Sequence, residues 1–406
     1  MPLKIDPDML LEGCGDESLD SGMRIDTVLD PLSGPGGPVK PAIYSGGVYQ
    51  WDSRWQQVED EQPTPVIVID NVPSQANHLE EALHQQRAAT GVPEFVLDLS
   101  RIDHLPSHLP RRISSLQFPH RNADAYLRDA RLDGADFLKT DRGKAIFNAT
   151  AQTCGPLMAW FPQALLYGFW QSHLGSKKTQ AKHARAWVSE IIGWAPATKK
   201  ENPTRLHGLK GDPLNLSIDS KVDFNEKDQA DWNLSEGVKG GGRTSGKKTN
   251  ALSNIGHGQA LTDSTPAAVS FGRITQRATV SFAQLRRVRL GNDDPGADAA
   301  VRAVLVALGL HAHNLAFGRG FALRSGAELE PRGRTVHWLG TGQDDQACDF
   351  GDHRDTADLL KQTLAVARDR NVPLDGWGQS VTLVPKPNLA QAIRETWPTL
   401  NPDAGP

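Results

Sequence analysis

Residues 65–70 read "PVIVID", and residues 73–89 read "PSQANHLEEALHQQRAA". The first stretch is rich in β-branched residues, which predicts a strand. In the second, Pro73 or Ser74 starts a helix that places Leu79 and Leu83 on one face. A strand-loop-helix unit of this kind predicts that the chain is built on a framework of strands and packed helices.

Further elements are expected on both sides of this unit. Strands are predicted at 23–32, 94–99, 273–290 and 320–331, and helices at 119–130, 136–151, 297–317, 355–370 and 388–397. Residues 162–194 predict an apolar half, a basic turn, and then a helix that exposes Lys182, His183 and Arg185 while Trp187, Val188, Ile191 and Ile192 face the core. Residues 196–262 are polar with little periodicity, so they are expected to be functional or disordered.

Bulk composition limits the classes of protein that fit. The chain has 406 residues, 38% of them hydrophobic, and a formal net charge of −4. Because nucleic-acid-binding proteins are usually basic, any such surface here must be local. Acids are frequent in 1–31, whereas 173–210 and 239–250 are basic. The length suggests several domains or one large core with long insertions.

Cysteine usage and hydropathy predict a cytoplasmic protein. Cys14, Cys154 and Cys348 are far apart and lack metal-ligand spacing, so neither a disulfide framework nor a zinc site is expected. The N-terminal residues show no apolar signal segment, and no apolar run reaches the length of a membrane span. No metal, cofactor or membrane partner is predicted.

A glycine-rich basic stretch, "KGGGRTSGKKTN", occupies residues 239–250. Gly241, Gly246 and Lys247 fit a Walker A loop, but Lys248 stands where the hydroxyl that binds Mg²⁺ should be. The flanking residues also lack the required strand and helix. Two other interpretations remain, a solvated flexible loop and a mobile basic loop that meets a phosphodiester backbone.

Short catalytic motifs are present only in poor contexts. The "HRD" at 353–355 lacks the other kinase motifs, and His311 and His313 lie two apart on a predicted helix, on different sides. Asp103, His104, His108 and His120 could support acid-base cleavage of RNA, although their proline-rich context predicts a loop. No catalytic residue is therefore assigned.

Polar and basic side chains on this framework could hold phosphate or sugar oxygens. The candidate RNA-binding residues are Ser74, Gln75, Asn77, Ser114, Ser115, His120, Arg121, Lys177, Lys178, Lys182, Arg185, Arg243, Lys247 and Lys248. Helix capping is the alternative for the short polar residues, and a solvated face is the alternative for the basic clusters.

Four stretches resemble one known family. They are residues 73–83, 113–127, 165–194 and 272–290, and "ALRSGAEL" at 322–329 also fits. The chain resembles the backbone subunit of the type I-G (formerly type U) CRISPR Cascade complex, the Csb-one branch of the Cas-seven family within the RAMP superfamily. The resemblance covers roughly residues 65–330, about two thirds of the chain, and omits the N-terminal arm and 196–262.

The resemblance implies an α+β fold, a modified RNA-recognition-motif (ferredoxin-like) palm with long helical and loop insertions. It divides a single RAMP-type domain (1–406) into an acidic arm (1–22), a mainly helical insertion (101–195), a polar basic loop insertion (196–262), the second half of the palm (263–345) and a C-terminal helical segment (346–406). Strand aromatics that stack bases in such motifs are sparse here, with only Phe271 and Phe282 near the strand at 273–282.

The implied function is non-catalytic binding of CRISPR RNA. Copies of the subunit would stack along the guide with other Cascade subunits, and the guide would pair with target DNA. Two alternatives stay open. One is an RNA-cleaving enzyme of the same superfamily that uses Asp98, Asp103 or His120, and the other is a nucleotide-binding enzyme that uses the glycine-rich loop.

Overall fold

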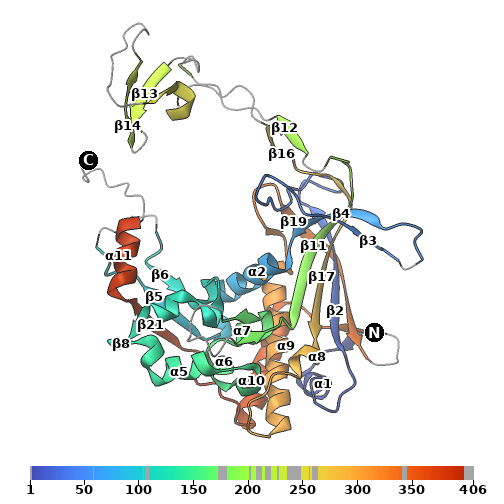
Figure 1. Ribbon diagram of the computed structural model, residues 1–406. Coiled ribbons are helices and arrows are strands. Elements are labelled where there is room, and N and C mark those ends of the chain that lie inside the picture. The colour runs from blue at the N-terminus through green and yellow to red at the C-terminus, as the bar shows by residue number, and fades with distance from the viewer. Residues whose placement is uncertain are drawn as a thin grey trace. The chain divides into compact units, whose positions relative to one another are not determined.

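The computed structural model describes residues 2–396 except 58, 104, 106–108, 172–180, 201–202, 207–212, 215–220, 226–227, 236–247, 256, 258–263 and 341–344 (Figure 1). The chain forms two compact units. Unit 1 consists of residues 1–42, 50–197 and 270–406, and unit 2 of residues 43–49 and 198–269.

A nine-stranded sheet is the centre of unit 1. Its path runs β1 (Leu3–Lys4), β20 (Gln346–Asp349), β19 (Glu328–Leu339), β2 (Gly22–Pro31), β17 (Phe271–Ser281), β11 (Trp187–Pro196), β4 (Thr64–Asp70) and β3 (Trp51–Arg54), while β18 (Phe321–Ala322) pairs with β19. All pairs are antiparallel except β1 with β20. Alternate residues of β2 and β17 are buried, so one face of this sheet belongs to the core.

Helices α2 (Val72–Gln85) and α9 (Pro295–Phe317) lie against this buried face (Figure 1). The side chain of Asn71 caps α2 by accepting from the Ser74 amide, so the helix begins slightly earlier than predicted. α9 is long and apolar enough to cross a membrane, but 89% of its most apolar part is buried inside the protein. That burial indicates the core helix of a soluble protein. α10 (His353–Asp369) packs beside it.

A second sheet in unit 1 has the order β6 (Arg112–Ser114), β5 (Glu94–Asp98), β21 (Ser380–Pro385), β7 (Ala130–Leu132) and β8 (Ala135–Asp136). The short helices near it are α4 (Ala125–Arg128), α5 (Asp141–Asn148), α6 (Gly155–Trp160), α7 (Pro162–Tyr167) and α11 (Pro387–Thr396). Phe95 contacts the rings of Phe137, Trp160 and Phe161, so aromatic packing joins β5 to these helices.

Unit 2 contains two small sheets. One pairs β12 (Thr204–Leu206) with β16 (Ser264–Pro266), and the other has the order β14 (Asp228–Leu234), β13 (Lys221–Asn225) and β15 (Lys248–Ala251). Val222, Phe224 and Leu252 form a separate small core. Residues 196–262 were expected to be functional or disordered, and the described part of this range contains the strands β12 to β15.

The predicted α+β class is confirmed, and so are the strands near 23–32, 65–70 and 94–99 and the helix near 297–317. The helix predicted over 182–194 is wrong, because these residues form β10 (Lys182–His183) and β11. β11 is a central strand of the sheet, and its adjacent residues Ile191 and Ile192, on opposite faces, are both buried. Two adjacent buried apolar residues also occur in a buried helix, so this pattern did not distinguish the two structures. The helix predicted at 119–130 is reduced to η2 (Arg121–Ala123) and the single turn α4. The predicted segment boundaries stay predictions.

Candidate nucleic-acid interface

Arg121 joins three of the segments that the sequence analysis singled out. Its Nε and Nη2 each donate to the Glu80 carboxylate of α2 at 2.7 Å, and Nη1 donates to the Gly168 carbonyl at 3.1 Å. The backbone of Arg121 has φ 53°, which is costly for a side chain of this size. The bidentate ion pair offsets that cost and fixes η2 against α2.

The pair between Arg121 and Glu80 is buried, with 12% and 5% of the side chains exposed. Burial raises the pKa of Glu80 in spite of the neighbouring Arg121 guanidinium. The guanidinium also lies 5.6 Å from the centre of the Tyr167 ring. Arg121 was predicted to bind RNA, but the structure uses it to hold the fold together.

Gln75 and Ser74 belong to what we call the anchor network, which is made of Asp70, Ser74, Gln75, Ser189, Gln276 and Arg324. The buried Asp70 carboxylate accepts from Ser74 at 2.8 Å, Gln75 at 2.6 Å and Arg324 at 2.8 Å. The Gln75 amide oxygen accepts from Gln276 at 2.7 Å and Ser189 at 3.3 Å. Gln75 is fully buried and ties α2 to β17 and β11, so in this structure it contacts protein side chains, and its contact with RNA stays a prediction.

Ser114 and Ser115 are also occupied inside the protein. Ser114 donates to the Glu94 carboxylate at 2.6 Å, and the Ser115 hydroxyl accepts from the Phe95 amide at 3.0 Å. Both residues are buried at the corner between β6 and η1 (Ser115–Gln117). Short hydroxyls at such corners satisfy buried backbone and carboxylate groups, so these two do not face a ligand.

The exposed candidates lie around this buried pair. We define the α2–β10 surface as Asn77, His120, Trp170, Lys182 and Arg185. Asn77 precedes Glu80 by one turn of α2, and His120 precedes Arg121. β9 (Phe169–Trp170) pairs with β10, which places Lys182 directly across from Trp170. Ser74, at the start of α2, is partly exposed but already bonded to Asp70.

Trp170 was missed by the sequence analysis. It is 60% exposed, and the Lys182 ammonium lies 5.8 Å from the centre of its ring. An exposed tryptophan beside a cation can stack on a nucleic-acid base. The signal was available in the sequence, since Trp170 lies seven positions before Lys177 in the same stretch.

Arg185 supplies a second cation on this surface. Its backbone and side chain pass close to Gly168, where φ is 80° and a Cβ atom would lie 2.9 Å from the His183 carbonyl oxygen. Partial burial lowers the pKa of Arg185, and the Arg121 charge lowers it further. Neither Lys182 nor Arg185 forms an ion pair within the part of the chain that the structure describes. Two unpaired cations beside an exposed indole can contact phosphate and base together.

Several other predicted residues cannot be placed on this surface. Lys177, Lys178, Arg243 and Lys247 lie outside the described residues, as do His104 and His108. Lys248 belongs to β15, where its backbone pairs with Phe224. A Walker A loop should be followed by a helix, so this strand contradicts the nucleotide-binding context at 239–250.

The remaining histidine and carboxylate motifs have structural roles or stand alone. Asp352 caps α10 over the "HRD" residues, and His311 hydrogen-bonds Thr356 from α9 at 3.2 Å. Hydrogen bonds from the Ser100 hydroxyl and from its amide lower the pKa of the Asp98 carboxyl, and Asp103 is exposed. In the described ranges, no three His, Cys, Asp or Glu side chains are grouped as a metal site requires.

Comparison with known protein families gives one match. Residues 23–197 match the family described as CRISPR-associated protein GSU0053. The matched region contains β2, α2, η2 and the α2–β10 surface. It supports a CRISPR-associated protein with a role in CRISPR defence. No curated protein matches the chain.

Proposed function

We propose that the protein is a non-catalytic guide-RNA-binding backbone subunit of a type I CRISPR surveillance complex (Cascade), of the type I-G branch. The family match over 23–197 supports the CRISPR context. The observation that carries the RNA-binding role is Trp170, an exposed indole near Lys182 and Arg185, two cations that form no ion pair among the described residues.

The order of elements in unit 1 supports a ferredoxin-like palm. β2, α2, β11, β17, α9 and β19 follow the order β-α-β-β-α-β along the chain, with other elements inserted. The four strands lie in the sheet order β19-β2-β17-β11, with every neighbouring pair antiparallel. This topology is that of RNA-recognition motifs and their relatives.

The α2–β10 surface fits a single strand of RNA that is recognised by base stacking and by charge. Trp170 would stack on one base whatever its identity, and Lys182 and Arg185 would contact adjacent phosphates. Asn77 and His120 add hydrogen-bonding groups for sugar or phosphate oxygens. The guide bound in this way would present its bases to target DNA, in the cytoplasm and without cleavage by this chain.

Charge supports the proposed assembly with further copies and with other Cascade subunits. A net charge of −4 on 406 residues leaves most of the surface without strong self-repulsion. On the outer face of the main sheet, positive and negative side chains are likewise paired, since Arg24 and Arg277 both pair with Asp26. The basic character is local, as a subunit that contacts both RNA and its own copies requires.

Binding of single-stranded RNA at several salt concentrations tests the proposal. Trp170→Ala should weaken binding by about 5- to 150-fold, the equivalent of about 1–3 kcal/mol for one stacked base. Lys182→Ala with Arg185→Ala should flatten the slope of log affinity against log salt by about 1.4, or roughly 0.7 for each phosphate contact. The matched control is Lys361→Ala with Arg368→Ala, which removes the same charge from the exposed side of α10.

Two results would contradict the proposal. Equal effects of the test and control pairs would show that the α2–β10 surface is not the RNA site. Cleavage of RNA with Mg²⁺ or Mn²⁺ at regular spacing, abolished by Asp103→Ala, would instead favour an endoribonuclease of the same superfamily.

A further inference from the structure

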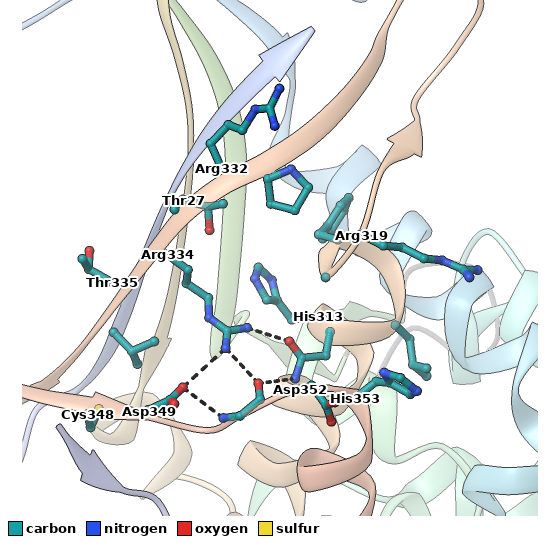
Figure 2. Close-up of a pocket in the computed structure, with 18 of the residues that line it drawn as sticks. Thr27, His313, Arg319, Arg332, Arg334, Thr335, Cys348, Asp349, Asp352 and His353 are labelled. Atoms are coloured by element: carbon teal, nitrogen blue, oxygen red, sulfur yellow. Dashed lines mark hydrogen bonds and ion pairs between the residues drawn. The ribbon is translucent and has the colours of Figure 1, made fainter. Parts of the chain in front are cut away.

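A cavity of about 920 Å³ lies in unit 1, away from the α2–β10 surface (Figure 2). Its walls come from β2, β19, β20, the C-terminal ends of α2 and α9, and the beginning of α10. None of the five residues of the α2–β10 surface lines it. The volume is within the range of small-molecule sites, about 300–1,000 Å³.

The cavity contains buried polar atoms without partners. Thr27 is 4% exposed and His313 is 2% exposed, and both line the cavity. The Thr27 Oγ1 and the His313 Nδ1 have no hydrogen-bond partner among the described residues. An unsatisfied buried polar atom costs about 1–3 kcal/mol, so two that face one cavity indicate a missing partner.

Arg334 brings a cation into the same cavity. It pairs with Thr27 across the strands, and its guanidinium donates to Asn314 at 2.7 Å and the Gly351 carbonyl at 2.8 Å. Its carboxylate contact, to Asp349, is longer at 3.4 Å. Figure 2 shows Arg334, His313 and Thr27 around one space.

Arg319 and Arg332 complete the cationic lining. Arg332 pairs with Asp30 and Glu330, whereas Arg319 is exposed and has no ion pair in the described part of the chain. The two aspartates of the lining already accept hydrogen bonds from the protein. Asp349 accepts from the Gly351 amide at 3.0 Å, and Asp352 caps α10. The lining therefore carries three arginines against two aspartates.

We propose that this cavity binds a mononucleotide-sized ligand through its phosphate. Arg319 and Arg334 would contact the phosphate, since guanidinium groups match phosphate geometry. Phe317, Pro331 and Val336 give an apolar wall for a base or sugar, and the Thr27 hydroxyl and neutral His313 would hydrogen-bond the nucleoside. The ligand is a free nucleotide or one nucleotide unit of a bound strand.

Calorimetric titration of the whole chain with UMP, AMP, uridine and inorganic phosphate tests this site. A nucleoside monophosphate should bind at least about tenfold more tightly than uridine. Arg319→Ala should weaken it roughly tenfold and Thr27→Val roughly threefold, as expected for one charged and one neutral hydrogen bond. Arg368→Ala, an exposed arginine with no ion pair in the described residues, is the control.

A second titration with an RNA octamer distinguishes the two sources. If the ligand is a unit of a strand, both variants weaken octamer binding and UMP competes with it. If the ligand is a free nucleotide, the variants weaken only UMP or AMP. The site is overturned if no monophosphate binds and neither variant affects the octamer, or if the variants behave like Arg368→Ala. Trp170→Ala should leave UMP affinity unchanged, so this site and the proposed RNA surface can fail separately.

Discussion

A row of polar residues, Gln276, Thr27 and Arg334, crosses β17, β2 and β19 on the buried side of the main sheet, and its two ends differ. Gln276 donates to Gln75 in the anchor network, where the Asp70 carboxylate accepts three hydrogen bonds. Thr27 and Arg334 face the cavity, and Thr27 Oγ1 has no partner in the described residues. Side chains at the first end hold α2 on the sheet through Gln75, although Gln276 Oε1 has no partner in the described residues. At the second end Arg334 is bonded to Asn314 and Gly351, and the proposed ligand would supply the partner that Thr27 lacks.

The largest effect should come from removing the carboxylate at the centre of the anchor network. Asp70→Ala leaves Arg324 and Gln75 without their buried acceptor, so the free energy of unfolding should fall by about 3–5 kcal/mol. Asp52→Ala removes an exposed carboxylate that pairs with Arg54 and should cost at most about 1 kcal/mol. Urea unfolding of both variants measures this. Equal losses would mean that the Asp70 carboxylate stabilises the fold no more than an exposed ion pair does.

Acid should destabilise the fold through two buried histidines of α9. Burial lowers the pKa of His311 to about 4 and that of His313 to about 3, from an ordinary 6.5. As pH falls below 6.5, the unfolded chain takes up protons that the folded protein does not. Stability from these two groups is therefore complete above pH 6.5 and lost below it, by about 2–3 kcal/mol in total at pH 5.5.

Unfolding between pH 8 and pH 5 measures this acid effect. His313→Leu removes one of the two titrating groups and should flatten the dependence on pH, while Gln362→Ala, at an exposed position of α10 without a titratable side chain, should not. An unchanged slope in His313→Leu would show that His313 is not held neutral.

The smallest effect on stability should come from Thr27→Val. The change removes a buried hydroxyl that has no partner in the described residues and keeps the side-chain shape. The free energy of unfolding should therefore fall by less than about 0.5 kcal/mol, or rise. Thermal unfolding without a ligand is the measurement. A loss above about 1 kcal/mol would show that the hydroxyl is satisfied inside the fold, and the cavity proposal would lose its main support.

Sequence patterns predicted the elements whose periodicity is unambiguous. The apolar run of α9 and the β-branched stretches of β2 and β4 predicted these elements, whereas the α+β class was implied by the family resemblance. β11 was misread because adjacent buried residues, Ile191 and Ile192, do not distinguish a central strand from a helix.

The site was harder to predict because it depends on distant partners. The sequence predicted that Arg121 binds RNA, but its guanidinium is paired with Glu80, which lies 41 positions earlier in the chain. Gln75 was predicted as a ligand contact, but its partner Gln276 lies 201 positions away. Composition and spacing identify polar donors, but only the fold determines which of them are already bonded. Trp170 was not predicted because RNA-recognition motifs stack bases on strand aromatics, which directed the prediction to Phe271 and Phe282.

Ultraviolet crosslinking of the whole chain to single-stranded RNA, with the modified peptides mapped by mass spectrometry, tests the central claim most directly. The account predicts adducts on the peptide that carries Trp170 and on those of Lys182 and Arg185, and their loss in Trp170→Ala. Adducts confined to the outer face of the main sheet, at Arg24, Arg277 or Trp194, with none at Trp170, would contradict it.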